Sequence, residues 1–81
     1  MKIEVLGTGC KKCKELEMTV KQAIAKSGKF IQLEKVEDIA KIMEYQLVST
    51  PGLVIDGKVV STGKVLSVNE VLEFIMGENT L

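Results

Sequence analysis

The chain has 81 residues, of which 46% are hydrophobic, and its 11 basic residues balance 11 acidic ones. From this length we expect one folded domain over residues 1–81, without room for a second core. The zero net charge argues against a nucleic-acid-binding or membrane-surface protein. A single proline and seven glycines argue against a disordered chain.

The compartment can be predicted from the apolar segments and the cysteine count. The first six residues are too charged and too short a segment for a signal peptide. The longest apolar run, Leu53–Ile55, is far below the roughly 20 residues that cross a bilayer. We therefore expect a cytoplasmic protein, with no membrane association. Thiols are kept reduced there, so a cysteine pair is more often catalytic or metal-binding than a permanent staple.

The first half of the chain predicts a strand, a helix and a second strand. Residues 2–6 alternate apolar and charged side chains, and a Gly7-Thr8-Gly9 turn follows. From about Lys11 to Ser27-Gly28, apolar residues recur at the spacing of one helical face. The residues on this face are Cys13, Leu16, Val20, Ala23 and Ile24. Phe30 to Val36 has the pattern of the second strand.

Next come a short helix and a hairpin. Asp38 can cap a helix that ends near Tyr45. Its predicted inward residues are Ile39, Ile42 and Met43. Residues 49–52 break the pattern, and the strands 53–55 and 58–60 then flank an Asp56-Gly57 turn, a strong hairpin signal.

Ser67 to Glu70 has the capping-box pattern of a last helix, which Gly77 would end. Its predicted buried stripe is Val71, Leu72, Ile75 and Met76, and residues 78–81 would form a frayed tail. The element order is βαβαββα, which predicts an α/β fold with a central four-stranded mixed sheet flanked by three helices. The first two strands should be parallel and joined by a right-handed crossover through the helix.

The cysteines Cys10 and Cys13 stand where the first strand pattern turns into a helix. The sulfur of Cys10 would face unpaired backbone N–H groups and the positive end of the helix dipole, and both favour a thiolate. The exposed side chains of Lys11 and Lys12 would tune this effect modestly. Cys13 lies nearly one turn deeper and should be less exposed. We therefore predict that Cys10 attacks a target disulfide and that Cys13 resolves the mixed disulfide.

Together with Ser49-Thr50-Pro51 and Val54–Lys58, this segment resembles thioredoxin-fold proteins. It is similar to the small archaeal and bacterial redox-active disulfide group, over Lys2 to about Met76. The resemblance implies a thioredoxin-like fold and a protein disulfide oxidoreductase with a Cys10–Cys13 redox couple and no other cofactor. It also implies that Pro51 is cis, that Val48, Ser49 and Thr50 line the docking groove, and that Gly63 is a close-approach backbone position beside it.

The chain departs from the family pattern at three places. Lys11-Lys12 replaces the Gly-Pro of thioredoxin and the Pro-Tyr of many glutaredoxins. Glu4 occupies the position of the buried aspartate of thioredoxins. It is either a solvent-facing strand residue, which we favour, or a proton acceptor for Cys13. Thr62-Gly63-Lys64 replaces the glutathione-binding Gly-Gly and acidic pair of glutaredoxins, so we do not expect glutathione recognition.

Two other functions compete for the same cysteines. A soft-metal module could bind Cu(I) or zinc through both thiolates. Small copper chaperones also carry CxxC after a first strand, but they end on a strand and carry Met where this chain has Thr8. Two cysteines without histidine cannot close a zinc site in one chain. A non-catalytic interaction domain is the third alternative. We favour a monomeric reductase of protein disulfides that binds no metal and receives electrons from an upstream thioredoxin-reductase-type enzyme, because the chain has no nucleotide- or flavin-binding motif.

Overall fold

The computed structural model describes residues 1–9, 11–46 and 49–77. The elements along this part of the chain are β1 (Lys2–Leu6), α1 (Lys11–Ser27), β2 (Gln32–Val36), α2 (Ile39–Glu44), β3 (Gly52–Ile55), β4 (Lys58–Thr62) and α3 (Val68–Met76). This order confirms the predicted βαβαββα arrangement. Three strand boundaries differ from the predicted ones. β2 begins two residues after the fully exposed Phe30, β3 begins one residue earlier, at Gly52, and β4 continues to Thr62.

The strands form one mixed sheet in the order β2-β1-β3-β4. β1 is central and pairs in parallel with β2 and antiparallel with β3. β4 completes the sheet as the antiparallel partner of β3, with a register irregularity between Leu53 and Val54. The predicted parallel crossover and hairpin are both confirmed.

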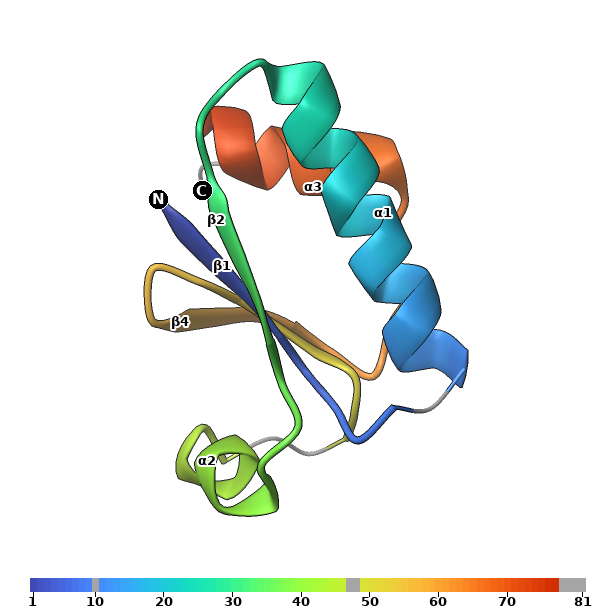
Figure 1. Cartoon of the computed structure of the whole chain (residues 1–81), viewed down its shortest axis with the longest axis vertical. Helices are drawn as coiled ribbons and strands as arrows, with labels where there is room; N and C mark the ends of the chain where they lie inside the picture. The colour runs from blue at the N-terminus through green and yellow to red at the C-terminus, as the bar shows by residue number, and fades with distance from the viewer. Residues whose placement is uncertain (10, 47–48, 78–81) are drawn as a thin grey trace.

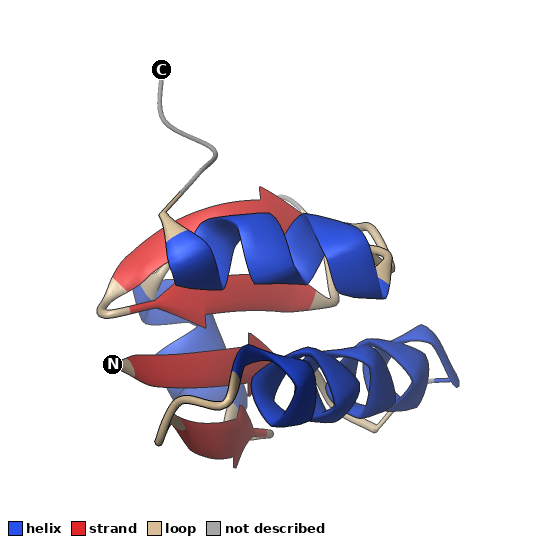
Figure 2. Ribbon diagram, turned by 90° about the horizontal axis from the view of Figure 1, so that it is seen from above, coloured by secondary structure: helices blue, strands red, loops and turns tan. Residues whose placement is uncertain are grey.

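The two faces of the sheet are covered unequally (Figures 1 and 2). α1 and α3 pack side by side on one face, and α2 lies on the other. Because side chains alternate along a strand, Ile3 and Val5 of β1 enter the core under α1 and α3, while Leu6 enters the smaller core under α2. The larger core also contains Leu16, Val20, Ala23, Leu53, Ile55, Leu66, Val71 and Ile75.

Two helical faces differ from the predicted ones. In α2 only Ile42 is buried, whereas Ile39 and Met43 are 62% and 69% exposed, so the prediction that they point inward was wrong. α2 has only 6 residues and meets the sheet through little more than one position. The prediction that Met76 is buried was also wrong, because its side chain, at the end of α3, is 47% exposed.

The helix caps agree with the sequence. Asp38 accepts a hydrogen bond from the backbone N–H of Ala40 at 2.9 Å and so caps α2. Ser67 and Glu70 form the predicted capping box of α3, with reciprocal bonds of 3.0 and 3.2 Å. The backbone N–H of Ser67 lowers the pKa of the Glu70 carboxyl. Gly77 ends α3 in the left-handed conformation, at φ 74°.

Replacing the capping serine tests this cap. Ser67→Ala should lower the free energy of unfolding by about 1 kcal/mol, because one backbone N–H of the first turn loses its acceptor. Urea unfolding followed by circular dichroism measures the loss. Asn69→Ala removes an exposed polar side chain from the same helix without touching the cap, so it should not destabilise the protein. An equal loss in both variants would contradict a specific role of the cap.

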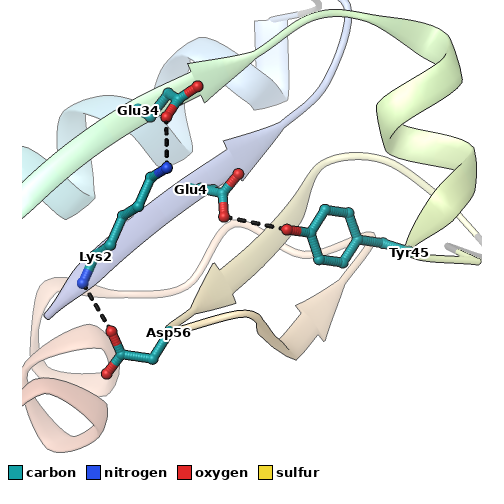
Figure 3. Close-up of polar contacts among 5 residues, drawn as sticks. All are labelled: Lys2, Glu4, Glu34, Tyr45 and Asp56. Carbon is teal, nitrogen blue, oxygen red and sulfur yellow. Dashed lines mark hydrogen bonds and ion pairs between the residues drawn. The ribbon is translucent and has the colours of Figure 1, made fainter.

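The face of the sheet beside α2 carries polar contacts as well as the smaller core (Figure 3). The Tyr45 hydroxyl, at the end of α2, donates a hydrogen bond to Glu4 Oε1 at 3.2 Å. Lys2 Nζ lies 2.9 Å from Glu34 Oε2, and the Lys2 backbone N–H donates to Asp56 Oδ1 at 2.9 Å. Partial burial raises the pKa of Tyr45, and the hydrogen bond and charge of Glu4 raise it further. The hydrogen bond from Tyr45 to Glu4 joins the end of α2 to the central strand, whereas the contacts of Lys2 join β1 to β2 and to the turn after β3.

The raised pKa of Tyr45 predicts a loss of stability at alkaline pH. A group whose pKa is higher in the folded than in the unfolded state contributes stability below its unfolded pKa, about 10 for tyrosine, and loses it as pH rises through the folded value. The free energy of unfolding should therefore fall less steeply between about pH 9 and 12 in Tyr45→Phe than in the wild type.

The comparison of slopes separates this effect from the lost hydrogen bond, which lowers the stability of Tyr45→Phe at every pH. Lys2, whose pKa the hydrogen bond and charge of Glu34 raise, is present in both proteins, and Tyr45 contributes a smaller part of that rise. Identical slopes in both proteins would show that Tyr45 does not contribute to alkaline unfolding.

Candidate active site

The CxxC segment opens α1. Cys13 lies in the first turn of α1 and is only 1% exposed, as the sequence predicted for the deeper of the two cysteines. Cys10 lies outside the described residues, so the sulfur–sulfur geometry and the role of Cys10 stay predictions.

Gly7 is required at the end of β1 because the Cys13 side chain lies directly against it. A Cβ on Gly7 would collide with Cys13 Sγ and would stand 3.1 Å from Cys13 Cβ. The Gly7 backbone N–H donates to the Val36 carbonyl at 3.0 Å, which ties this loop to the end of β2. The sequence indicated only a turn here, because the contact with Cys13 depends on how the helix returns over the strand.

The start of α1 is strongly basic. Lys11, Lys12 and Lys14 are exposed, and the first turn contains no acidic residue. None of the ion pairs formed by the described residues involves these lysines. Positive charge at a helix N-terminus opposes the helix dipole, so this arrangement disfavours the helix and favours an anion placed there.

The predicted groove residues meet at one end of the sheet. The Thr50–Pro51 peptide bond is cis, which confirms the geometry that the resemblance implied, and Pro51 is fully buried. The Gly63 N–H donates to the Pro51 carbonyl at 2.8 Å. Gly63 has φ +68°, and a Cβ there would collide with Ser49 Oγ. Ser49, Pro51 and Gly63 are therefore in mutual contact, and Val48 lies outside the described residues.

Strand register explains why these loops meet beside Cys13. Leu6 of β1 is aligned with Val36 of β2 and with Gly52 of β3. Gly52 is in turn aligned with Thr62 of β4. One residue beyond this row stand Glu37, Gly7, Pro51 and Gly63. The ends of β1 and β2 lie at the lower end of the sheet in Figure 1. The loop before α1, the cis-proline loop and the end of β4 thus form one surface.

Glu4 lies away from this surface. It is on the face of β1 opposite Ile3 and Val5, which pack toward α1, and its carboxylate accepts the hydrogen bond from Tyr45. Glu4 is half-buried beside α2. This position does not support a role as proton acceptor for Cys13.

Within residues 1–9, 11–46 and 49–77, three or more His, Cys, Asp or Glu side chains nowhere group as a metal site would require. Over the same ranges, no helix has the length and apolar character to cross a membrane.

A helix that begins within a CxxC segment, at the same end of a mixed sheet as a cis-proline loop, is typical of the thioredoxin-fold class of proteins. The chain matches the thioredoxin domain family over residues 1–76, and it belongs to that family. Family membership supports thiol–disulfide oxidoreductase activity in general and protein disulfides as substrates.

Curated relatives and a solved structure agree with this assignment. The thioredoxin of Methanothermobacter thermautotrophicus is 35% identical over 75 residues, which is 93% of this chain and 97% of the relative. The thioredoxin of Methanocaldococcus jannaschii is 39% identical over 71 residues, 88% of this chain and 81% of the relative. A solved structure described as "Structure of a malarial protein" has a TM-score of 0.70 at 16% identity, covers 98% of this chain and 97% of its own, and shows the likeness of fold alone.

The contact between Gly63 and Ser49 predicts an unusually sensitive glycine. Gly63→Ala should destabilise the protein by more than the roughly 1–2 kcal/mol that a left-handed backbone costs, because the new methyl group also meets Ser49 Oγ. Gly57→Ala is the matched control, since Gly57 has φ +81° and nothing lies within 4 Å of its Cβ position.

A double variant separates the two costs. Ser49→Ala removes the obstructing oxygen, so it should recover part of the loss in Gly63→Ala and none of the loss in Gly57→Ala. Urea unfolding of the five variants, singly and combined, gives the coupling energy. Equal losses at positions 57 and 63, or no coupling with Ser49, would refute the close approach.

Proposed function

We propose that the protein reduces protein disulfides with a dithiol–disulfide couple formed by Cys10 and Cys13. The observation that carries this proposal is the placement of buried Cys13 in the first turn of α1. Its side chain packs against Gly7, which follows the end of β1, and Leu6 before it is aligned with Gly52, the residue after the cis-proline. Membership of the thioredoxin family supports it.

The start of α1 supports the assignment of Cys10 as the attacking group. A thiolate at this position would face the free N–H groups of the first turn and would relieve the unfavourable charge of Lys11, Lys12 and Lys14. Such surroundings lower a cysteine pKa from about 8.5 toward the range of roughly 3.5–7.5. The lysines tune the effect only modestly, because exposed charges interact weakly.

The reaction proceeds by two exchanges. The Cys10 thiolate attacks one sulfur of the substrate disulfide, and the other substrate sulfur leaves as a thiolate and takes up a proton. Cys13 then loses its proton and attacks the Cys10 sulfur, which releases the second substrate sulfur. Two electrons pass to the substrate, and the protein is left with a Cys10–Cys13 disulfide.

Substrate docking is assigned to the loop before β3. Ser49 and Thr50 are exposed, whereas Pro51 is buried and held by Gly63, so the loop offers its backbone to an extended segment from a fixed position. Val48 completes the proposed groove. Charged groups on the substrate would meet the lysines at the start of α1.

The oxidised protein must be reduced again before another cycle. We assign this step to an upstream reductase of the thioredoxin-reductase type, with the cysteine couple as the only redox group of a monomeric chain. The cytoplasm, where thiols are kept reduced, stays the predicted compartment.

Trapping tests the roles of the two cysteines. Cys13→Ser should accumulate a mixed disulfide between Cys10 and a substrate protein such as oxidised insulin, because no second thiol can resolve it. Cys10→Ser should not. Non-reducing electrophoresis and mass spectrometry of the adduct identify the attacking residue.

The wild type should also accelerate the reduction of insulin by dithiothreitol, and a variant without either cysteine provides the baseline. Failure to accelerate it, together with no adduct in either single variant, would refute the oxidoreductase. An adduct only in Cys10→Ser would reverse the two roles.

A further inference from the structure

A carboxylate that the reaction scheme does not use lies against the CxxC loop. Glu37 follows the last residue of β2, and its Oε2 lies 3.5 Å from the position that a Cβ on Gly9 would occupy. Gly9 immediately precedes Cys10 in the chain. No local sequence pattern indicated this contact, because Glu37 and Gly9 come from separate loops.

The fold holds this carboxylate near the loop from two sides. Val36, just before Glu37, accepts the 3.0 Å hydrogen bond from Gly7. Asp38, just after it, is fixed by its own cap of α2. Because the backbone is anchored on both sides of Glu37, its side chain starts close to Gly9. The neighbouring Asp38 carboxylate already accepts the hydrogen bond from the backbone N–H of Ala40.

The charges around the CxxC loop are of both signs. α1 contributes Lys11, Lys12 and Lys14 in its first turn, and Glu15 follows them on the same helix. The cis-proline loop contributes uncharged Ser49 and Thr50, and Lys64 follows Gly63 beyond β4. From the β2–α2 connection comes Glu37, so a negative charge stands opposite the basic helix start.

We propose that Glu37 is a positioning residue that opposes thiolate formation at Cys10. A carboxylate near a thiol disfavours its ionised form, in contrast to the lysines and the helix dipole. The opposition has a chemical use, because a thiolate becomes a weaker nucleophile as its pKa falls, and the best attacking thiol has a pKa near the ambient pH. This inference rests on the proposed function, in which Cys10 is the attacking residue.

Alkylation kinetics in a Cys13→Ser background test the proposal, because Cys10 is then the only thiol. The rate of reaction with iodoacetamide against pH gives the Cys10 pKa. Glu37→Gln should lower this pKa by about 0.2–0.7 units, the size expected for one exposed charge pair. Glu37→Lys should lower it further, and Glu37→Asp should retain most of the wild-type value.

Salt separates a charge effect from a structural one. The difference between Glu37→Gln and the parent should shrink as the salt concentration rises from about 0.02 to 1 M, because the screening length falls to about 3 Å. Glu73→Gln, on the exposed surface of α3, removes the same charge elsewhere and should leave the Cys10 pKa unchanged.

An unchanged Cys10 pKa in both Glu37→Gln and Glu37→Lys would overturn the inference, as would a shift of equal size in Glu73→Gln or one that salt does not reduce. The readout needs no turnover of a substrate. Failure of the inference can therefore be told from failure of the proposed function, which the insulin and trapping experiments decide.

Discussion

The backbone pairing of β1 with two strands at once is the constraint on which the candidate site depends. β1 is bonded in parallel to β2 and antiparallel to β3, and β4 adds to β3. The aligned row Val36, Leu6, Gly52 and Thr62 therefore ends at one edge, and the next residues of the four strands are neighbours beyond it. Hydrogen bonds from Gly7 to Val36 and from Gly63 to Pro51 continue the order of the sheet into the loops. The loops of the site are extensions of a rigid sheet, which is how a fold holds reacting groups in a defined geometry.

Close packing beyond the sheet requires two glycines for different reasons. At Gly7 the requirement is steric, because Cys13 occupies the space of a Cβ. At Gly63 a second requirement is added, since the backbone has a positive φ as well as Ser49 against it. A side chain at Gly7 would push the helix start away from the end of β1, and a side chain at Gly63 would push the cis-proline loop away from the end of β4. Stability and geometry of the site are therefore linked at these two positions.

The charge at the start of α1 does not add to the stability of the helix. The lysines of the first turn oppose the helix dipole, yet α1 is 17 residues long and buries four of them, Cys13, Leu16, Val20 and Ala23. Most helical stability in proteins comes from tertiary packing, so a helix packed in this way tolerates an unfavourable first turn. Under the proposed function, a positive helix start together with the carboxylate of Glu37 would favour the Cys10 thiolate to a limited degree.

Local sequence patterns were enough to predict the helices and strands and to mark the two cysteines as the candidate site. The helical spacing from Cys13 to Ala23, the caps at Asp38 and Ser67, and the Asp56-Gly57 turn all involve residues close in the chain, whose physics a short window contains. The CxxC spacing at a helix start likewise indicated redox chemistry.

Tertiary structure decided which residues of α2 are buried, because Ile39 and Met43 have the right spacing but no neighbouring element to cover them. It also decided the contacts of Gly7 with Cys13, Gly63 with Ser49 and Glu37 with Gly9. Each of these contacts joins separate segments of the chain. Only the register of the sheet, or the packing of a helix over it, brings such segments together, so a local sequence pattern contains no information about these contacts.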